Sequence, residues 1–143
     1  MTVRTTDGGV TAPRGFRSAA VHCGIKAVAG ALDLTVLAAD ASSPAAGIFT
    51  TNLAKAAPVL LSMRHLDRTH GLARAIVVNS GCANACTGVQ GMADAERMAV
   101  EVAASLGCAQ DEVLVASTGV ISVNLKMDKV VPGIRAASAA LDR

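Results

Sequence analysis

The chain has 143 residues, which fits one domain able to bury roughly 70% of its unfolded-chain surface. Hydrophobic residues make up 52% of it and aromatic residues only 1%, so we expect a core of aliphatic side chains and alanine. A net charge of +2 and the scarcity of stacking rings argue against nucleic-acid binding. Without a ~20-residue apolar run or a secretory signal, the sequence predicts a cytoplasmic protein that binds no membrane.

The first part of the chain predicts several strands. We expect one strand over residues 16–26, a second over the apolar run 33–39, and a third over 45–51. Segment 59–68 fits a helix or a strand, and we favour a helix. Because these first three strands follow one another without helices, the sequence predicts a mixed sheet.

The second part predicts strands that alternate with helices. Strands are expected over 74–79 and 112–116, and amphipathic helices over 92–106 and 127–141. This alternation indicates an α/β fold in one domain, residues 1–143. We expect the apolar stripes of both helices to need a partner surface, so that an isolated chain would self-associate. The stripes contain Met98, Val102 and Leu106, and Val130, Ile134 and Leu141.

Two strands end in turns of small residues, over 79–91 and 117–121. Turns of this kind can present backbone N–H groups to an oxygen-rich ligand. The glycine spacing in the first turn matches neither a dinucleotide fingerprint nor a P-loop. Taken alone, Ser117-Thr118-Gly119 most often means a plain turn, and without a Gly-x-Ser-x-Gly motif Ser117 is a poor nucleophile.

The cysteines and histidines carry no clear signal of their own. The cysteine spacing matches no zinc site, so we expect no metal and small, mostly buried thiols in a reducing compartment. Cys86 stands in the turn before a helix, but no histidine lies near it in sequence as a base. His65 and His70 lie in a polar stretch that predicts a solvated surface. The remaining cysteines and histidine of the chain are Cys23, Cys82, Cys108 and His22.

Several short segments, taken together in order and spacing, resemble the amino-terminal half of the ornithine acetyltransferases of arginine biosynthesis. The fold that this implies is a mixed sheet layered with helices, as in the self-cleaving DmpA/ArgJ-like fold. The chain departs from the family pattern at Cys82, Ser122 and Lys126, where asparagine, glycine and proline are usual. The segments are 9–17, 24–26, 33–34, 45–52, 55–59, 77–81, 83–88, 116–121 and 127–129.

The resemblance implies a glutamate N-acetyltransferase reaction. Members of the family transfer an acetyl group from N-acetylornithine to glutamate, and some also use acetyl-CoA as a co-substrate; no other cofactor is expected. They cleave themselves before a threonine, whose freed α-amine can activate its own hydroxyl. Carried over to this chain, the Thr118 hydroxyl and the Gly119 N–H would form the oxyanion hole.

The resemblance also implies that the self-cleavage threonine is supplied from outside these 143 residues. We therefore expect an amino-terminal (alpha) part that contains the oxyanion hole and no nucleophile. Its expected partner is the carboxy-terminal (beta) half, in a hetero-oligomer that acts on small molecules. The substrate-binding residues are not identified by the sequence. A second hypothesis stays open, in which the chain is a remnant or a binding module without turnover, so that whether it is an enzyme is undecided.

Overall fold

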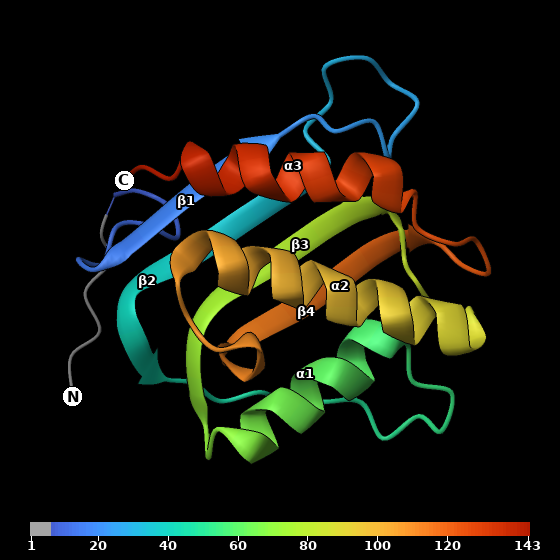
Figure 1. Ribbon diagram of the computed structural model, residues 1–143, viewed down its shortest axis with the longest axis horizontal. Coiled ribbons are helices and arrows are strands. Elements are labelled where there is room, and N and C mark those ends of the chain that lie inside the picture. The colour runs from blue at the N-terminus through green and yellow to red at the C-terminus, as the bar shows by residue number, and fades with distance from the viewer. Residues whose placement is uncertain (1–6) are drawn as a thin grey trace.

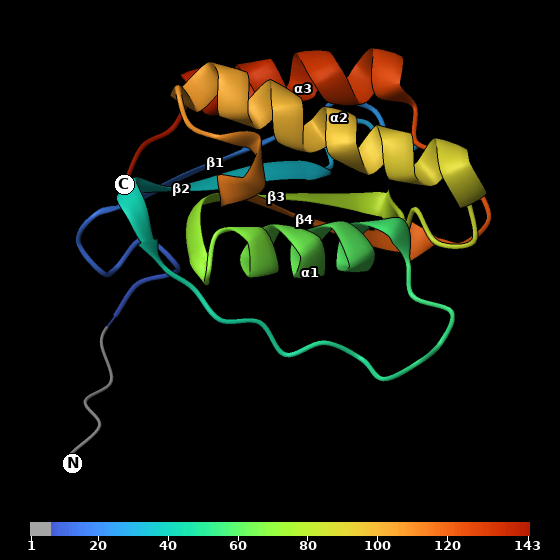
Figure 2. The same cartoon turned by 60° about the horizontal axis from the view of Figure 1, so that its bottom comes forward.

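The fold is seen in a computed structural model that describes residues 7–143. A four-stranded sheet in the order β1-β2-β3-β4 forms its centre (Figures 1 and 2). The first three strands are antiparallel neighbours, and β4 runs parallel to β3. The predicted α/β class and mixed sheet are thus confirmed. The strands are β1 (Phe16–Val21), β2 (Leu34–Pro44), β3 (Leu72–Cys82) and β4 (Val113–Val120).

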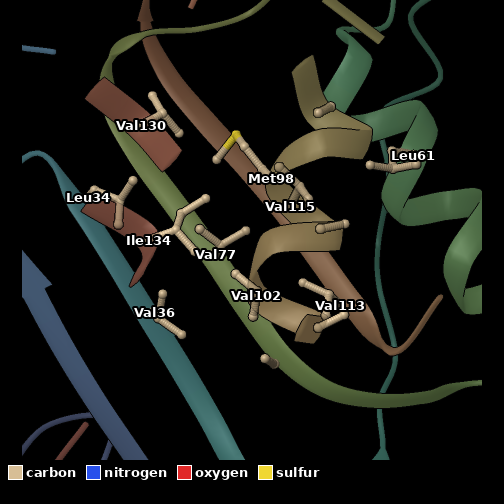
Figure 3. Packing of buried hydrophobic residues seen from close by; sticks show 14 of the residues in the cluster. Leu34, Val36, Leu61, Val77, Met98, Val102, Val113, Val115, Val130 and Ile134 are labelled. Atoms are coloured by element: carbon tan, nitrogen blue, oxygen red, sulfur yellow. The ribbon is translucent and has the colours of Figure 1, made fainter. Parts of the chain in front are cut away.

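Two helices, α2 (Gly88–Leu106) and α3 (Met127–Ala139), cover one face of the sheet (Figure 2). Their apolar stripes point into the core, where Met98 and Ile134 are completely buried beside Val77 of β3 (Figure 3). The expectation that these stripes need a partner from elsewhere is therefore wrong, because the chain's own sheet covers them. The further core residues of these two helices are Ala95, Ala99, Val102, Ala103, Val130 and Ala137.

The opposite face of the sheet is only partly covered. The register aligns Leu37, Ile76 and Leu114 across the sheet. All three are half-buried. Strand alternation places them on the face away from α2 and α3. The segment 45–56 passes on this side of the sheet before α1 begins (Figure 2).

The third helix, α1 (Ala57–Arg68), packs against β4 and α2 (Figures 1 and 2). The helix favoured for this segment is confirmed. Pro58 stands in its first turn, where the missing N–H costs nothing and the fixed φ suits a helix.

Two of the expected strands differ most from the structure, whereas the other expected elements form with shifted ends; β2 extends to Pro44, and α3 ends at Ala139 instead of residue 141. No strand forms over 45–51 in the described residues: β2 and β3 are already paired on both sides, α1 lies along β4, and Asp142 bridges to Ser18 at the β1 edge. The apolar Ile48 of this segment is fully exposed. The first strand ends at Val21 instead of residue 26, where the chain bends around the carboxylate of Asp33.

None of the helices in residues 7–143 is both long and apolar enough to cross a membrane. Within the same residues, no three His, Cys, Asp or Glu side chains are grouped as a metal site would require.

Candidate functional site

The two turns singled out in the sequence lie side by side at the carboxyl ends of β3 and β4. In the parallel register, Ser80 lies opposite Thr118 and Gly81 lies opposite Gly119. Ligands of sheets with parallel strands commonly bind beyond these strand ends. The structure thus brings the two predicted segments together at one place.

Gly119 is needed for the close contact between these strand ends. Its φ of 133° lies in the region that favours glycine. A Cβ at this position would overlap the backbone of Gly81 and Cys82. The two backbones can therefore approach each other only while residue 119 has no side chain.

The outer edge of β4 is covered by side chains of α1 along part of its length. The Ser62 hydroxyl donates to the Val115 carbonyl at 2.8 Å and accepts from the Val115 N–H at 2.9 Å. The Nδ1 of His65 lies 2.8 Å from the Val113 carbonyl oxygen. These two side chains pair with the strand edge as a fifth strand would.

The same edge is exposed at its carboxyl end. Because alternate residues of a strand turn their N–H and C=O groups to the same edge, the backbone of Gly119 faces the side that Val113 and Val115 face. Thr118 and Gly119 are both exposed. The Thr118 side chain leaves the strand on the same face as Leu114. The Gly119 N–H thus lies at the outer edge of β4, and the Thr118 hydroxyl lies on the adjoining face of the same strand. Their role as an oxyanion hole stays a prediction.

Ser117 is half-buried, and its hydroxyl oxygen is buried beneath this surface. Its hydroxyl oxygen has no hydrogen-bond partner within residues 7–143. Neighbouring Asn79 donates from Nδ2 to the Cys82 carbonyl at 2.8 Å. That Ser117 is a poor nucleophile stays a prediction.

The turn after β3 is held by a buried amide that the sequence analysis missed. Asn84 is fully buried, donates to the Gly91 carbonyl at 2.8 Å and accepts from the Thr87 hydroxyl at 2.7 Å. Its φ of 47° is left-handed, a conformation that asparagine tolerates well. The sequence signal that could have indicated this role is an asparagine within a turn of small residues.

The segment after β4 is bonded back to this turn. The Ala83 N–H donates to the Val120 carbonyl and the Ser122 N–H to the Ala85 carbonyl, both at 2.9 Å. Ser122 has a φ of 63°. Ser122 therefore has a backbone conformation that favours glycine, the residue expected there from the resemblance.

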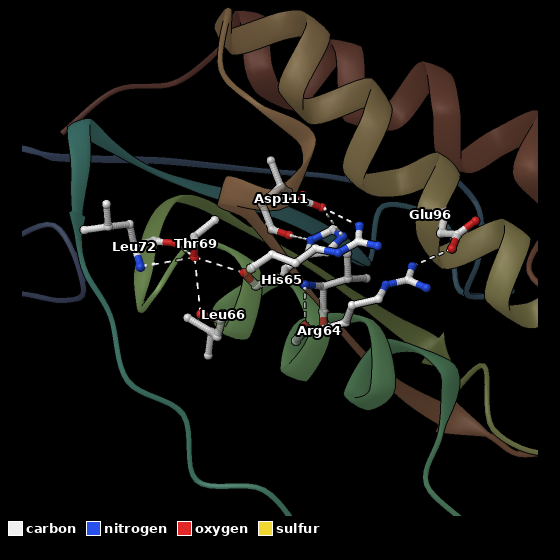
Figure 4. Close-up of polar contacts among 11 residues, drawn as sticks. Arg64, His65, Leu66, Thr69, Leu72, Glu96 and Asp111 are labelled. Atoms are coloured by element: carbon white, nitrogen blue, oxygen red, sulfur yellow. Dashed lines mark hydrogen bonds and ion pairs between the residues drawn. The ribbon is translucent and has the colours of Figure 1, made fainter.

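His65 is not on a solvated surface as the sequence predicted. Its side chain is completely buried, and its Nε2 lies 3.4 Å from Oδ1 of Asp111, which also contacts Arg68 (Figure 4). His65 belongs to the side of α1 that packs on β4, where the unpaired Val113 carbonyl at the strand edge needs a hydrogen-bond partner. The prediction failed since it treated the stretch 64–70 as one exposed unit.

The cysteines are all free. Cys82 is buried and donates to the Val123 carbonyl, and Cys23 and Cys108 are half-buried. Burial and the neighbouring carboxylate of Asp33 raise the pKa of Cys23 to about 11. Cys86 is exposed, contrary to the expectation of a mostly buried thiol.

Comparison with known proteins gives consistent results. The ArgJ family model matches residues 17–143. The chain is 53% identical over 135 residues to the "Arginine biosynthesis bifunctional protein ArgJ" of Symbiobacterium thermophilum, covering 94% of this chain and 33% of that protein. The counterpart from Thermotoga neapolitana is 50% identical over 131 residues, covering 92% and 32%. The chain thus spans about a third of the length of the curated relatives it matches.

Two solved structures are also similar. The ornithine acetyltransferase of Mycobacterium tuberculosis, complexed with ornithine, matches with a TM-score of 0.88 and 46% identity, covering 94% of this chain and 71% of that one. ArgJ from Bacillus halodurans matches with a TM-score of 0.84 and 36% identity, covering 90% and 65%. By sequence and by fold, the chain belongs to the ArgJ family.

Proposed function

We propose that this chain is the part of an arginine-biosynthesis acetyltransferase that stabilises the oxyanion during acetyl transfer from N-acetylornithine to glutamate. The Gly119 N–H and the Thr118 hydroxyl are the donors. The observation that carries the proposal is the position of Gly119 on the β4 edge, just beyond the part that Ser62 and His65 cover.

The start of α1 supports this assignment electrostatically. A hollow of about 290 Å³ beside β4 is lined by Ala56 and Pro58 from the start of α1 and by Ser117. The amino-terminal end of a helix carries a partial positive charge. An oxyanion bound beyond Ser117 would therefore lie near the positive end of α1 as well as near the two donors.

The reaction needs a nucleophile that we assign to the remaining part of the protein. A threonine hydroxyl, activated by its own α-amine, attacks the acetyl carbonyl and forms a tetrahedral oxyanion. Donors already in place stabilise that charge without reorganisation, and removal of one such donor typically costs ~10²- to 10³-fold in rate. We propose acetyl-CoA as an additional acetyl donor, and no other cofactor.

The partner of this chain would pack on the open face of the sheet. Leu37, Ile76 and Leu114 form an apolar band there, and two hollows meet at Ile76 and Leu114. Because the matched relatives are about three times as long as the matched region, the rest of their sequence is the natural occupant of this face.

An acetyl-transfer assay tests the proposal. The 143-residue chain is assayed alone and together with the remaining two thirds of the Symbiobacterium thermophilum relative, supplied as a separate polypeptide. We expect transfer from N-acetylornithine to glutamate only with both parts. Transfer by the chain alone would contradict the proposal, and a stable complex of both parts without transfer would favour a binding module.

A further inference from the structure

A buried carboxylate, Asp33, lies in a hydrogen-bond network next to the candidate site and has no part in it so far. Asp33 precedes β2, and its side chain is completely buried. Three backbone N–H groups point at the carboxylate: Cys23 at 2.7 Å, Gly24 at 3.1 Å and Lys26 at 3.0 Å. The loop 22–26 is thus wrapped around one side chain.

The charge of this carboxylate is stabilised by the loop. Burial alone would raise the pKa of Asp33, but the N–H groups of Cys23 and Lys26 outweigh it and lower the pKa to about 2. The Nδ1 of His22 lies 3.5 Å from Oδ2 of Asp33 and 2.8 Å from the Ala31 carbonyl oxygen. Asp33 is therefore ionised at neutral pH and bound tightly to the loop.

The backbone of Asp33 connects three elements. Its N–H donates to the Val21 carbonyl at the end of β1 at 3.0 Å, and its carbonyl accepts from the Ser80 N–H at 2.9 Å. Ser80 is the residue of β3 that lies opposite Thr118. One residue thus fixes the end of β1, the loop and the end of β3.

The loop in turn rests on Gly81. A Cβ at Gly81 would lie 3.0 Å from Cγ2 of Ile25 and 3.1 Å from Cγ of Lys26. On its other side Gly81 contacts Gly119, whose missing side chain permits that approach. A continuous series of packed groups therefore runs from the Asp33 carboxylate through Ile25 and Gly81 to the proposed N–H donor.

We infer that Asp33 is a positioning residue for the Thr118–Gly119 site, which acts by holding the loop 22–26 against Gly81. The inference rests on the proposed function for its catalytic consequence. Oxyanion donors work only at defined distances, and small displacements of reacting groups can cost large factors in rate. A looser loop would let the Gly81 and Gly119 backbones shift together.

The charge, and not only the shape, is required. Asparagine has the shape of aspartate, but it offers one acceptor oxygen and turns an NH₂ group toward N–H donors. In Asp33→Asn at least one part-buried N–H of the loop loses its acceptor. Glu101→Gln is the matched control, since Glu101 is a buried carboxylate that bonds Arg97 and Arg135 on the helical layer.

Three measurements test the inference. The first is the rate at which iodoacetamide alkylates Cys23, resolved by peptide mapping, because burial and the neighbouring Asp33 carboxylate raise the pKa of this thiol. The second is the ¹H–¹⁵N shift of the Gly119 amide in the labelled chain. The third is kcat and KM for acetyl transfer when the remaining part of the enzyme is present.

For Asp33→Asn we expect alkylation of Cys23 about tenfold faster, a displaced Gly119 amide signal, and a kcat about tenfold lower with little change in KM. Glu101→Gln should change none of these. Faster alkylation with an unchanged Gly119 signal and unchanged kcat would show that Asp33 holds only the loop, and would overturn the inference.

A second variant decides the matter if Asp33→Asn does not fold. Ile25→Ala removes the side chain that lies nearest to Gly81, leaves the Lys26 contact in place and keeps the Asp33 hydrogen bonds. It should displace the Gly119 signal, and an unchanged signal would overturn the inference. If no acetyl transfer occurs in any mixture, the proposed function fails, while alkylation and the Gly119 signal still decide whether Asp33 positions the strand end.

Discussion

Gly119 of β4 lies opposite Gly81 of β3, and the backbone of Gly81 occupies the space that a side chain at residue 119 would need. This contact joins the end of β4, on which both proposed donors lie, to the end of β3. We expect the contact to transmit to β4 any displacement of β3, so that the geometry of the site would depend on residues remote in sequence.

The first prediction concerns this glycine pair. Gly119→Ala must relieve a backbone overlap as well as an unfavourable φ of 133°, so we expect a loss of about 3 kcal/mol in the free energy of unfolding. Gly107→Ala is the control, because its φ of 65° is also positive but a Cβ there meets open space. Urea unfolding should show a loss of about 1 kcal/mol for the control. Equal losses would mean that the strand ends are not in close contact.

The second prediction concerns Ser122. Replacement by glycine relieves the strain of a φ of 63° and leaves the bond from its N–H to the Ala85 carbonyl intact. We expect Ser122→Gly to stabilise the chain by about 1 kcal/mol, measured as a higher midpoint of urea unfolding.

Asn84→Gly provides the contrast for that substitution. It also relieves a positive φ, but it removes a buried hydrogen bond to Gly91 and a part-buried one with Thr87. Asn84→Gly should therefore be destabilising by about 1–3 kcal/mol. A stabilising Asn84→Gly or a destabilising Ser122→Gly would contradict this account of the two positions.

The third prediction tests whether α1 takes the place of a strand at the β4 edge. Ser62→Ala leaves the Val115 N–H and C=O buried without their partner, which should cost about 1–3 kcal/mol of stability. Ser105→Ala removes a serine bond to a helical carbonyl near the surface, and it should cost less than about 0.5 kcal/mol. Chemical unfolding of the two variants under identical conditions provides the comparison.

The fourth prediction concerns acid stability. The pKa of Asp33 is lowered from 3.8 to about 2 in the folded chain, so its contribution to stability is fully present above pH ~4 and is lost as the pH falls toward 2. The contribution is about 2 kcal/mol. Asp33→Asn should lower stability at pH 7 and flatten its dependence on pH between about 4 and 2. An unchanged acid transition would show that other carboxylates determine it.

Much of this fold could be predicted from the sequence, because long amphipathic patterns report burial directly. The helices around Met98 and Ile134 and the strand containing Val77 follow such patterns, and all three residues are in the core. The segment 45–51 has an equally strand-like sequence. It forms no strand in the described residues, since pairing depends on a free neighbouring edge, and periodicity carries no information about edges.

The site was predictable to a smaller extent. The turns at Gly81 and Gly119 were visible as small residues after apolar strands, and the structure brings them together. The buried roles of His65 and Asn84 were not predictable, because each depends on a partner distant in the fold or on a backbone conformation. Asp33 looked like the first residue of a strand and nothing in its spacing indicated a loop wrapped around it.

The most direct measurement of the central claim is kcat for acetyl transfer by the chain, assembled with the remaining part of the enzyme, for the parent and for Thr118→Ala. We predict a kcat lower by ~10²- to 10³-fold with KM nearly unchanged, because the charge that Thr118 stabilises develops only in the transition state. Stability should change by about 1 kcal/mol or less, and the exposed Thr51→Ala should change neither quantity. Equal kcat values for the parent and Thr118→Ala would contradict the assignment of the oxyanion hole.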